Sequence, residues 1–202
     1  LGMFDLCQYE LAKGEVMALP EAPNPASIDL LQFKTPFDDT APYERPNHLG
    51  AAYAAFASAD FDSDVATLQS LGAPLLSAPY GEPGKRFVFF RDPDGVLYRL
   101  EESAGQAIAG REMKIFDMPY VAINVSDLDE SLAFYEQLGY RPVGDIVDYT
   151  GSASEASAYG LEGALQTRSV EIELSRGDHH RLLLTQWLQP MDLDPPYPPP
   201  IN

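Results

Sequence analysis

The stretch Tyr120–Tyr135, YVAINVSDLDESLAFY, followed by Leu138-Gly139-Tyr140, decides the fold. Its first residues are small and apolar at strand-like spacing, and Asp127 stands just before a run with helical spacing. An aspartate at that place accepts hydrogen bonds from the first helical N–H groups, and a Leu-Gly pair is a common helix end. The stretch therefore predicts a strand, then a helix, then a stop at Gly139.

The same pattern occurs earlier in the chain at a constant spacing of 67 residues, from Tyr53 to Tyr120. The residues that recur are Tyr53, Phe56, Asp60, Leu71 and Gly72, repeated as Tyr120, Ile123, Asp127, Leu138 and Gly139. Self-similarity at a fixed period indicates repeated structural units. The sequence therefore predicts two copies of one strand–helix unit.

Further strands follow each predicted helix. In the earlier copy we expect them at 74–77, 86–90 and 96–101, and the segment Arg91-Asp92-Pro93-Asp94-Gly95 between the last two has the composition of a tight turn. In the later copy we expect strands at 141–148, 170–174 and 181–187. Each copy is thus a βαβββ module, and the fold class is α+β.

A third, incomplete copy is predicted at the N-terminus. Residues 28–33 match residues 182–187 at a spacing of 154. We therefore divide the chain into the C-terminal part of an incomplete module (1–41), a second module that pairs with the first (42–105), a linker (106–115), a third module (116–190) and a Pro-rich linker toward an absent fourth module (191–202).

The composition of the chain restricts which partners it is expected to bind and where in the cell it is expected to occur. The chain has 202 residues and a formal net charge of −18, so its surface repels phosphate backbones and anionic lipids. We expect no nucleic-acid and no membrane partner. Without a signal-like start or a long apolar run, we expect a cytoplasmic protein. Cys7 is the single cysteine, which leaves no thiolate cluster for zinc.

Two segments carry a family resemblance. Residues 120–140 and 89–98 resemble the vicinal oxygen chelate superfamily, which includes glyoxalase I, bleomycin resistance proteins and extradiol dioxygenases. The resemblance implies that tandem βαβββ modules pair and that their mixed sheets curl into cup-shaped half-barrels with the helices outside. In metal-using members, it implies a histidine on each first strand and a glutamate on each last strand as ligands of one divalent ion.

Those implied ligand positions hold other residues in this chain. The first-strand positions, seven residues before each capping aspartate, are Tyr53 and Tyr120; the last-strand positions are Arg99 and Leu183. The partial first copy retains an acid there, Asp29. An arginine stays protonated and repels a cation. We therefore expect no cofactor. A register slipped by two residues would make Glu101 the carboxylate and favour a divalent metal, which remains the alternative.

The other histidines offer little to a metal site. His48 lies at the entry to a predicted strand, and His179 and His180 lie in a predicted hairpin loop, where they are expected to be solvated. Adventitious metal binding by the adjacent pair is the alternative.

We expect Asp29, Tyr53 and Arg99 to converge where the metal would lie and, with Tyr120, to form the ligand-binding positions. An Asp–Arg pair with a tyrosine hydroxyl would grip a ligand oxygen, or Asp29 and Arg99 would only form a buried ion pair. Tyr120 would face the cup made with the absent module. The loop 151–166 would cover that cup as a lid or be a disordered insertion.

Three functions follow from these expectations. The first is a metal-free protein that binds a small organic molecule in a sheet-lined cup. The second is an enzyme of the same superfamily, either a divalent-metal lyase, isomerase or dioxygenase, or a metal-independent isomerase or lyase that uses Arg99 and the tyrosines. The third is a structural protein whose cups are filled by its own side chains. The exposed edges of a half-module predict a homodimer. The residues leave the catalytic groups undefined.

Overall fold

The computed structural model describes residues 10–18, 27–35, 42–177 and 181–192. These residues form a two-stranded sheet and a nine-stranded sheet with three helices. His179, His180 and the proline-rich residues 193–202 lie outside this part of the chain. No helix within it is long and apolar enough to cross a membrane.

The nine-stranded sheet is built from the second and third modules. The second supplies β3 (Gly50–Ser58), α1 (Phe61–Ser70), β4 (Phe87–Arg91) and β5 (Leu97–Glu102). A short strand, β6 (Ile115–Asp117), follows at the end of the predicted linker. The third supplies β7 (Tyr120–Asn124), α2 (Leu128–Gln137), β8 (Arg141–Pro142), β9 (Val147–Gly151), α3 (Ala153–Ala158), β10 (Leu165–Glu173) and β11 (Arg181–Gln189).

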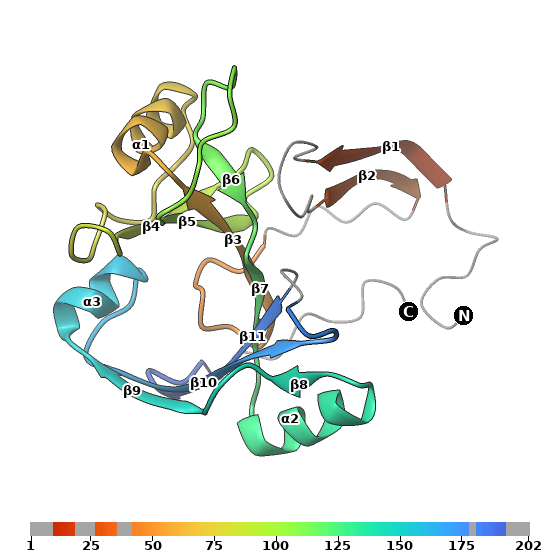
Figure 1. Ribbon diagram of the computed structural model, residues 1–202, viewed down its shortest axis with the longest axis vertical. Coiled ribbons are helices and arrows are strands. Elements are labelled where there is room, and N and C mark those ends of the chain that lie inside the picture. Colours follow the sequence, from red (N-terminus) through yellow and green to blue (C-terminus); the bar gives the residue numbers. More distant parts are fainter. Residues whose placement is uncertain (1–9, 19–26, 36–41, 178–180, 193–202) are drawn as a thin grey trace.

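The strand order explains how the two modules join. It runs β4-β5-β3-β7-β11-β10-β8, with β6 beside β3 and β9 beside β10. In each module the last strand lies parallel to the first, β5 to β3 and β11 to β7, and the two first strands meet antiparallel at the centre. The mixed sheet and the α+β class are as predicted. The sheet curls into an open C, with α1 and α2 outside it and α3 at its opening (Figure 1).

The partner of the second module differs from the expected one. We expected it to pair with residues 1–41. Among the strands that the structure describes, β1 (Glu10–Ala18) and β2 (Ser27–Thr35) pair with each other as an antiparallel hairpin and with no strand of the large sheet, from which they lie apart (Figure 1). The first strand of each module leaves one edge free for pairing with another module. In the structure this edge of β3 is paired with β7, so it is not open to the N-terminal strands.

Both predicted helices begin and end where the sequence indicates. The Asp60 and Asp127 carboxylates accept hydrogen bonds from Ser63 N and Glu130 N, at 3.3 and 2.9 Å. Gly72 and Gly139 follow the helices with φ of +77° and +98°, a backbone conformation that favours glycine.

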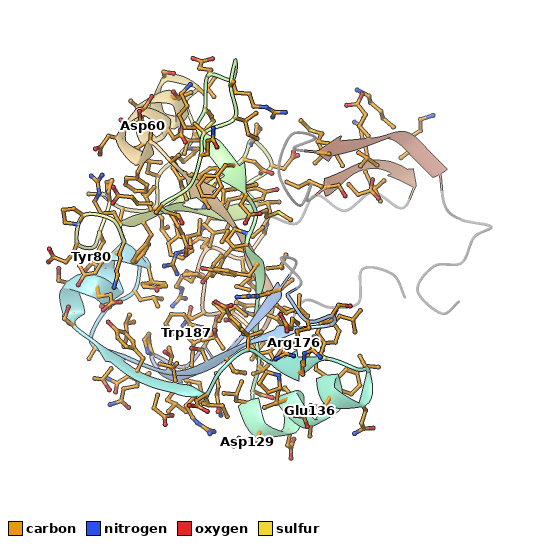
Figure 2. All side chains as sticks on the ribbon, in the orientation of Figure 1. Asp60, Tyr80, Asp129, Glu136, Arg176 and Trp187 are labelled. Atoms are coloured by element: carbon orange, nitrogen blue, oxygen red, sulfur yellow. The ribbon has the colours of Figure 1, made fainter. Side chains whose placement is uncertain are left out.

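Alternating side chains give the sheet two apolar faces. On the convex face, Phe61, Val65 and Leu68 of α1 pack on Val88, Phe90 and Leu100, and Leu128 of α2 packs on Val170, Ile172 and Leu184. The concave face is lined by a second buried set, which we call the cup: Tyr53, Ala55, Phe87, Phe89, Leu97, Tyr120, Ala122 and Ala158. Side chains fill the space inside the C, where Trp187 lies (Figure 2).

Three local predictions need correction. Residues 74–77 form no strand and contribute one isolated bridge, Leu75 with Phe90. The segment predicted as one strand at 141–148 is divided into β8 and β9, and the loop 151–166 contains α3. Ser152 begins α3 by accepting a hydrogen bond from Glu155 N at 3.1 Å.

Candidate functional site

Three of the four predicted site residues meet in the cup. Tyr53 is on β3 and Tyr120 on β7, and their ring centroids lie 6.4 Å apart. Arg99 is on β5, directly beside Ala55 of β3. Because alternate residues of a strand share a face, these positions all project from the concave side. The tyrosines are buried, each with 8% of its surface exposed.

Arg99 places a positive charge among aromatic rings. Its guanidinium carbon lies 4.1 Å from the centroid of Phe87, 5.7 Å from Phe89 and 5.9 Å from Tyr159. The negative faces of such rings attract a cation. Only 16% of the Arg99 side chain is exposed, and a guanidinium does not lose its proton in proteins. The cup therefore holds a fixed, largely desolvated charge.

Glu101 is the acidic partner of this arginine. Its Oε1 lies 2.9 Å from Arg99 Nε. The Nε atom has no partner in hydrogen-bonding geometry, so the contact is an ion pair and not an aligned hydrogen bond. The Tyr120 hydroxyl donates a 2.5 Å hydrogen bond to the same Oε1. The residue that a two-residue register slip would have made a metal ligand thus holds Arg99 and Tyr120.

The tyrosine hydroxyls of the cup are neutral over a wide pH range. Burial raises the pKa of Tyr53, although the charge of Arg99 opposes the shift. Burial, together with Tyr53, raises the pKa of Tyr120 well above its ordinary value. Burial raises the pKa of Tyr159 to about 12. At neutral pH these groups are hydrogen-bond donors.

The remaining predicted positions behave differently. Leu183 packs against the cup, so this cup, and not one made with an absent module, contains the position. Asp29 belongs to β2 in the separate hairpin, and its side chain is exposed. The structure thus does not bring Asp29 to Arg99, and Glu101 takes the place expected for it beside the guanidinium.

Sequence reasoning placed the loop 151–166 over a cup, in agreement with the position of α3, but did not identify the aromatic wall that its Tyr159 forms with Phe87 and Phe89. Tyr159 follows α3 and lies 5.2 Å from both Phe87 and Phe89 and 5.6 Å from Trp187, between ring centroids. Its hydroxyl accepts a hydrogen bond from Arg99 Nη1 at 3.4 Å. The alternation Phe87-Val88-Phe89 was a usable signal for two rings on one face. The position of Tyr159 depends on how a loop folds back, which local pattern does not report.

The donor set does not suit a divalent metal. Within the described ranges no three His, Cys, Asp or Glu side chains lie close enough together to hold an ion. More directly, the implied ligand positions carry a permanent cation and two tyrosines whose pKa values are raised. Divalent ions bind neutral imidazoles and anionic carboxylates or thiolates, and Arg99 would repel them.

A cavity of about 330 Å³ lies next to the cup. The cup residue Leu97 lines it, and so does Ala52, which packs against the cup. Its opposite wall comes from the segment 42–48, including Tyr43 and His48, whose Nδ1 lies 3.0 Å from Asp192 Oδ2. The described residues thus leave room for a small molecule within reach of the concave face.

Comparison with known proteins supports the fold. The chain resembles glyoxalase I from Zea mays, with a TM-score of 0.58 and 18% identity, over 92% of this chain and 56% of that one. Two structures of mutants of the same enzyme give TM-scores of 0.57 and 0.53, at 18% and 16% identity; they cover 92% and 91% of this chain and 57% and 60% of those chains. No family model and no curated protein sequence matches.

These likenesses define a class by its architecture. The chain has the fold of the vicinal oxygen chelate proteins, as the repeat and the motif residues predicted. It spans little more than half of the length of the glyoxalase I chains that it matches. At such low identity the likeness concerns the fold, and function has to be argued from the cup.

Proposed function

We propose that this protein binds a small organic molecule in the cup, without a metal, through an oxygen of the ligand held by Arg99. The observation that carries the proposal is the guanidinium itself, fixed among Phe87, Phe89 and Tyr159 where the resemblance implies a metal. A desolvated cation attracts a carboxylate or a polarised carbonyl strongly, as a metal would.

The Arg99 guanidinium retains N–H groups that can donate hydrogen bonds to such a ligand. The bond from Arg99 to Tyr159 is long, at 3.4 Å, and Nε has no aligned partner. Tyr53 adds a neutral hydroxyl to the same cluster. Glu101 orients the guanidinium and is itself held by Tyr120, so an incoming oxygen would meet a charge that is already positioned.

Calorimetric titration of the purified protein with small carboxylates tests this proposal. We expect at least one of pyruvate, cyclohexanecarboxylate and benzoate to bind the wild type, and Arg99→Met to bind it at least tenfold more weakly. Arg168→Met is the matched control, because Arg168 forms exposed ion pairs with Asp129 and Asp148 outside the cup. Equal binding by the wild type and Arg99→Met would overturn the role of Arg99, and no binding by the wild type would overturn the function.

Elemental analysis separates this function from its divalent-metal alternative. We expect the wild type to purify without stoichiometric metal and to bind the carboxylate equally with and without a chelator. About one divalent ion per chain, lost in Glu101→Ala or Tyr53→Ala, would overturn the metal-free function and favour a metal-dependent lyase, isomerase or dioxygenase.

A further inference from the structure

The phenol of Tyr159 lies in a part of the cup that is aromatic on its sides and cationic at one end. Three aromatic rings surround it, with interplanar angles of 55° to Phe87, 52° to Phe89 and 76° to Trp187. Tilted and edge-on arrangements at these separations are favourable for aromatic pairs. At its polar end the phenol oxygen meets the Arg99 guanidinium. This part of the cup thus matches a flat ring with an oxygen at one end.

Tyr159 lies in the segment that connects β9 to β10 and is not itself part of the large sheet. The segment comprises α3, of six residues, which spans the opening of the C (Figure 1). The segment is tied to the opposite module by a hydrogen bond from Ser77 Oγ to Ala158 O at 3.1 Å; the same hydroxyl also lies 2.9 Å from a second acceptor, Ala78 O. Ala156 and Leu161 pack beside Trp187. So short a helix adds few backbone hydrogen bonds of its own.

We infer that Tyr159 holds the place of the ligand, and that the ligand is a planar aryl compound with a carboxylate or phenol oxygen. This inference rests on the proposed function and gives it a ligand class. On binding, the aryl ring replaces the Tyr159 ring among Phe87, Phe89 and Trp187, and its oxygen replaces the hydroxyl at Arg99. A carboxylate makes the stronger partner, because it accepts two charge-assisted hydrogen bonds from a guanidinium.

The chain offers an intrinsic probe of this exchange. Trp187 is its only tryptophan, and Tyr159 is in ring contact with it. Its Nε1 donates a 2.9 Å hydrogen bond to Asn124 Oδ1, which fixes the indole on the cup side of β11. Displacement of Tyr159 by a ligand therefore changes the surroundings of the single indole fluorophore.

The test compares benzoate with cyclohexanecarboxylate, which has the same charge and a similar size but no aromatic ring. We expect wild-type protein to bind benzoate at least tenfold more tightly than cyclohexanecarboxylate. Tryptophan emission should change on benzoate binding and reach its limit at the same benzoate concentration at which calorimetry shows saturation. In Tyr159→Ala no tyrosine ring has to be displaced, so this variant should bind benzoate at least tenfold more tightly than the wild type does. Tyr159→Phe keeps the ring and should bind benzoate within about threefold of wild type.

The outcomes distinguish this inference from the proposed function. If both acids bind with equal affinity, the aryl class is wrong and the Arg99 site stands. If neither binds and other small carboxylates also fail, both are wrong. If benzoate binds only Tyr159→Ala, Tyr159 is a permanent core residue and the exchange does not occur. The wild-type comparison decides the question even if Tyr159→Ala fails to fold.

Discussion

The Tyr120 hydroxyl, on the first strand of one module, donates a 2.5 Å hydrogen bond to Glu101 Oε1, on the last strand of the other. Because the same oxygen lies 2.9 Å from Arg99 Nε, the three side chains form one chain of polar contacts across the junction of β3 and β7. The two halves of the sheet are thus joined by backbone pairing at β3–β7 and by this polar cluster in the cup.

Tyr120→Phe removes that hydrogen bond with little change in shape. We expect the free energy of unfolding to fall by about 1.5–2 kcal/mol, the low end of the range for a hydrogen bond to a charged acceptor. Urea unfolding followed by tryptophan fluorescence measures it. Tyr149→Phe is the control, because Tyr149 makes an equally short bond to Glu155 at an exposed position and should cost less. Equal losses would mean that burial of the Tyr120 bond adds nothing.

Arg99→Met should destabilise the protein more than Tyr120→Phe does, by about 2–3 kcal/mol, because it leaves the Glu101 carboxylate without its cation. Glu101 has only 23% of its side chain exposed, so water replaces the arginine poorly. The double variant Arg99→Met/Glu101→Gln should recover part of the loss. A double-mutant cycle from urea unfolding checks this, and strict additivity would contradict a direct coupling.

The fold was predictable because its signals are local and repeated. Asp60 and Asp127 cap their helices and Gly72 and Gly139 follow them, since capping and positive φ each depend on a few consecutive residues. The choice of partner was not predictable. The repeat makes every first strand equivalent, so it cannot say whether β3 pairs with β7 or with the N-terminal residues.

The arrangement of the candidate site was predictable in part for the same reason. Tyr53 and Arg99 follow from register within one module, and the structure brings them together with Tyr120. Asp29 was assigned through the expected pairing and lies elsewhere. Glu101 shares the face of Arg99, but only the approach of Tyr120 from the other module shows what it contacts.

Stability should fall on the alkaline side. Tyr53, Tyr120 and Tyr159 have raised pKa values in the folded protein, about 12 for Tyr159, against about 10 in an unfolded chain. The unfolded chain therefore loses these protons first. Their contribution is full below about pH 10 and is lost as pH rises through the folded-state pKa values, which for Tyr159 is about 12. Urea midpoints from pH 8 to 12 should show this, and Tyr159→Phe should decline less steeply; an identical decline would exclude Tyr159 as a source.

Acid should weaken the contact between Arg86 and Glu102. Hydrogen bonds from Arg86 hold the pKa of Glu102 at about 2 in the folded protein, below its value of about 4.3 in an unfolded chain. The contribution is therefore present above about pH 4.5 and is lost as pH falls toward 2. Arg86→Gln should be less stable than wild type at pH 7, and the two should converge near pH 2. Lys13→Gln, which removes an exposed ion pair with Glu15, should show no such convergence.

Removing the positive charge of Arg99 and replacing the two tyrosines of the cup by histidine should create a metal site. Tyr53→His/Tyr120→His/Arg99→Ala places two imidazoles beside Glu101 and removes the cation, which gives the nitrogen and oxygen donors that Zn²⁺ and Ni²⁺ prefer. We expect about one Zn²⁺ per chain by elemental analysis after dialysis, and none for wild type. The control is Tyr53→His/Tyr120→His with Arg99 retained. There the guanidinium still neutralises Glu101 and repels the ion, so affinity should be about 10–100-fold weaker. If the double variant binds zinc as tightly as the triple, the arginine does not exclude metal from this cup, and only the identity of residues 53 and 120 controls zinc binding.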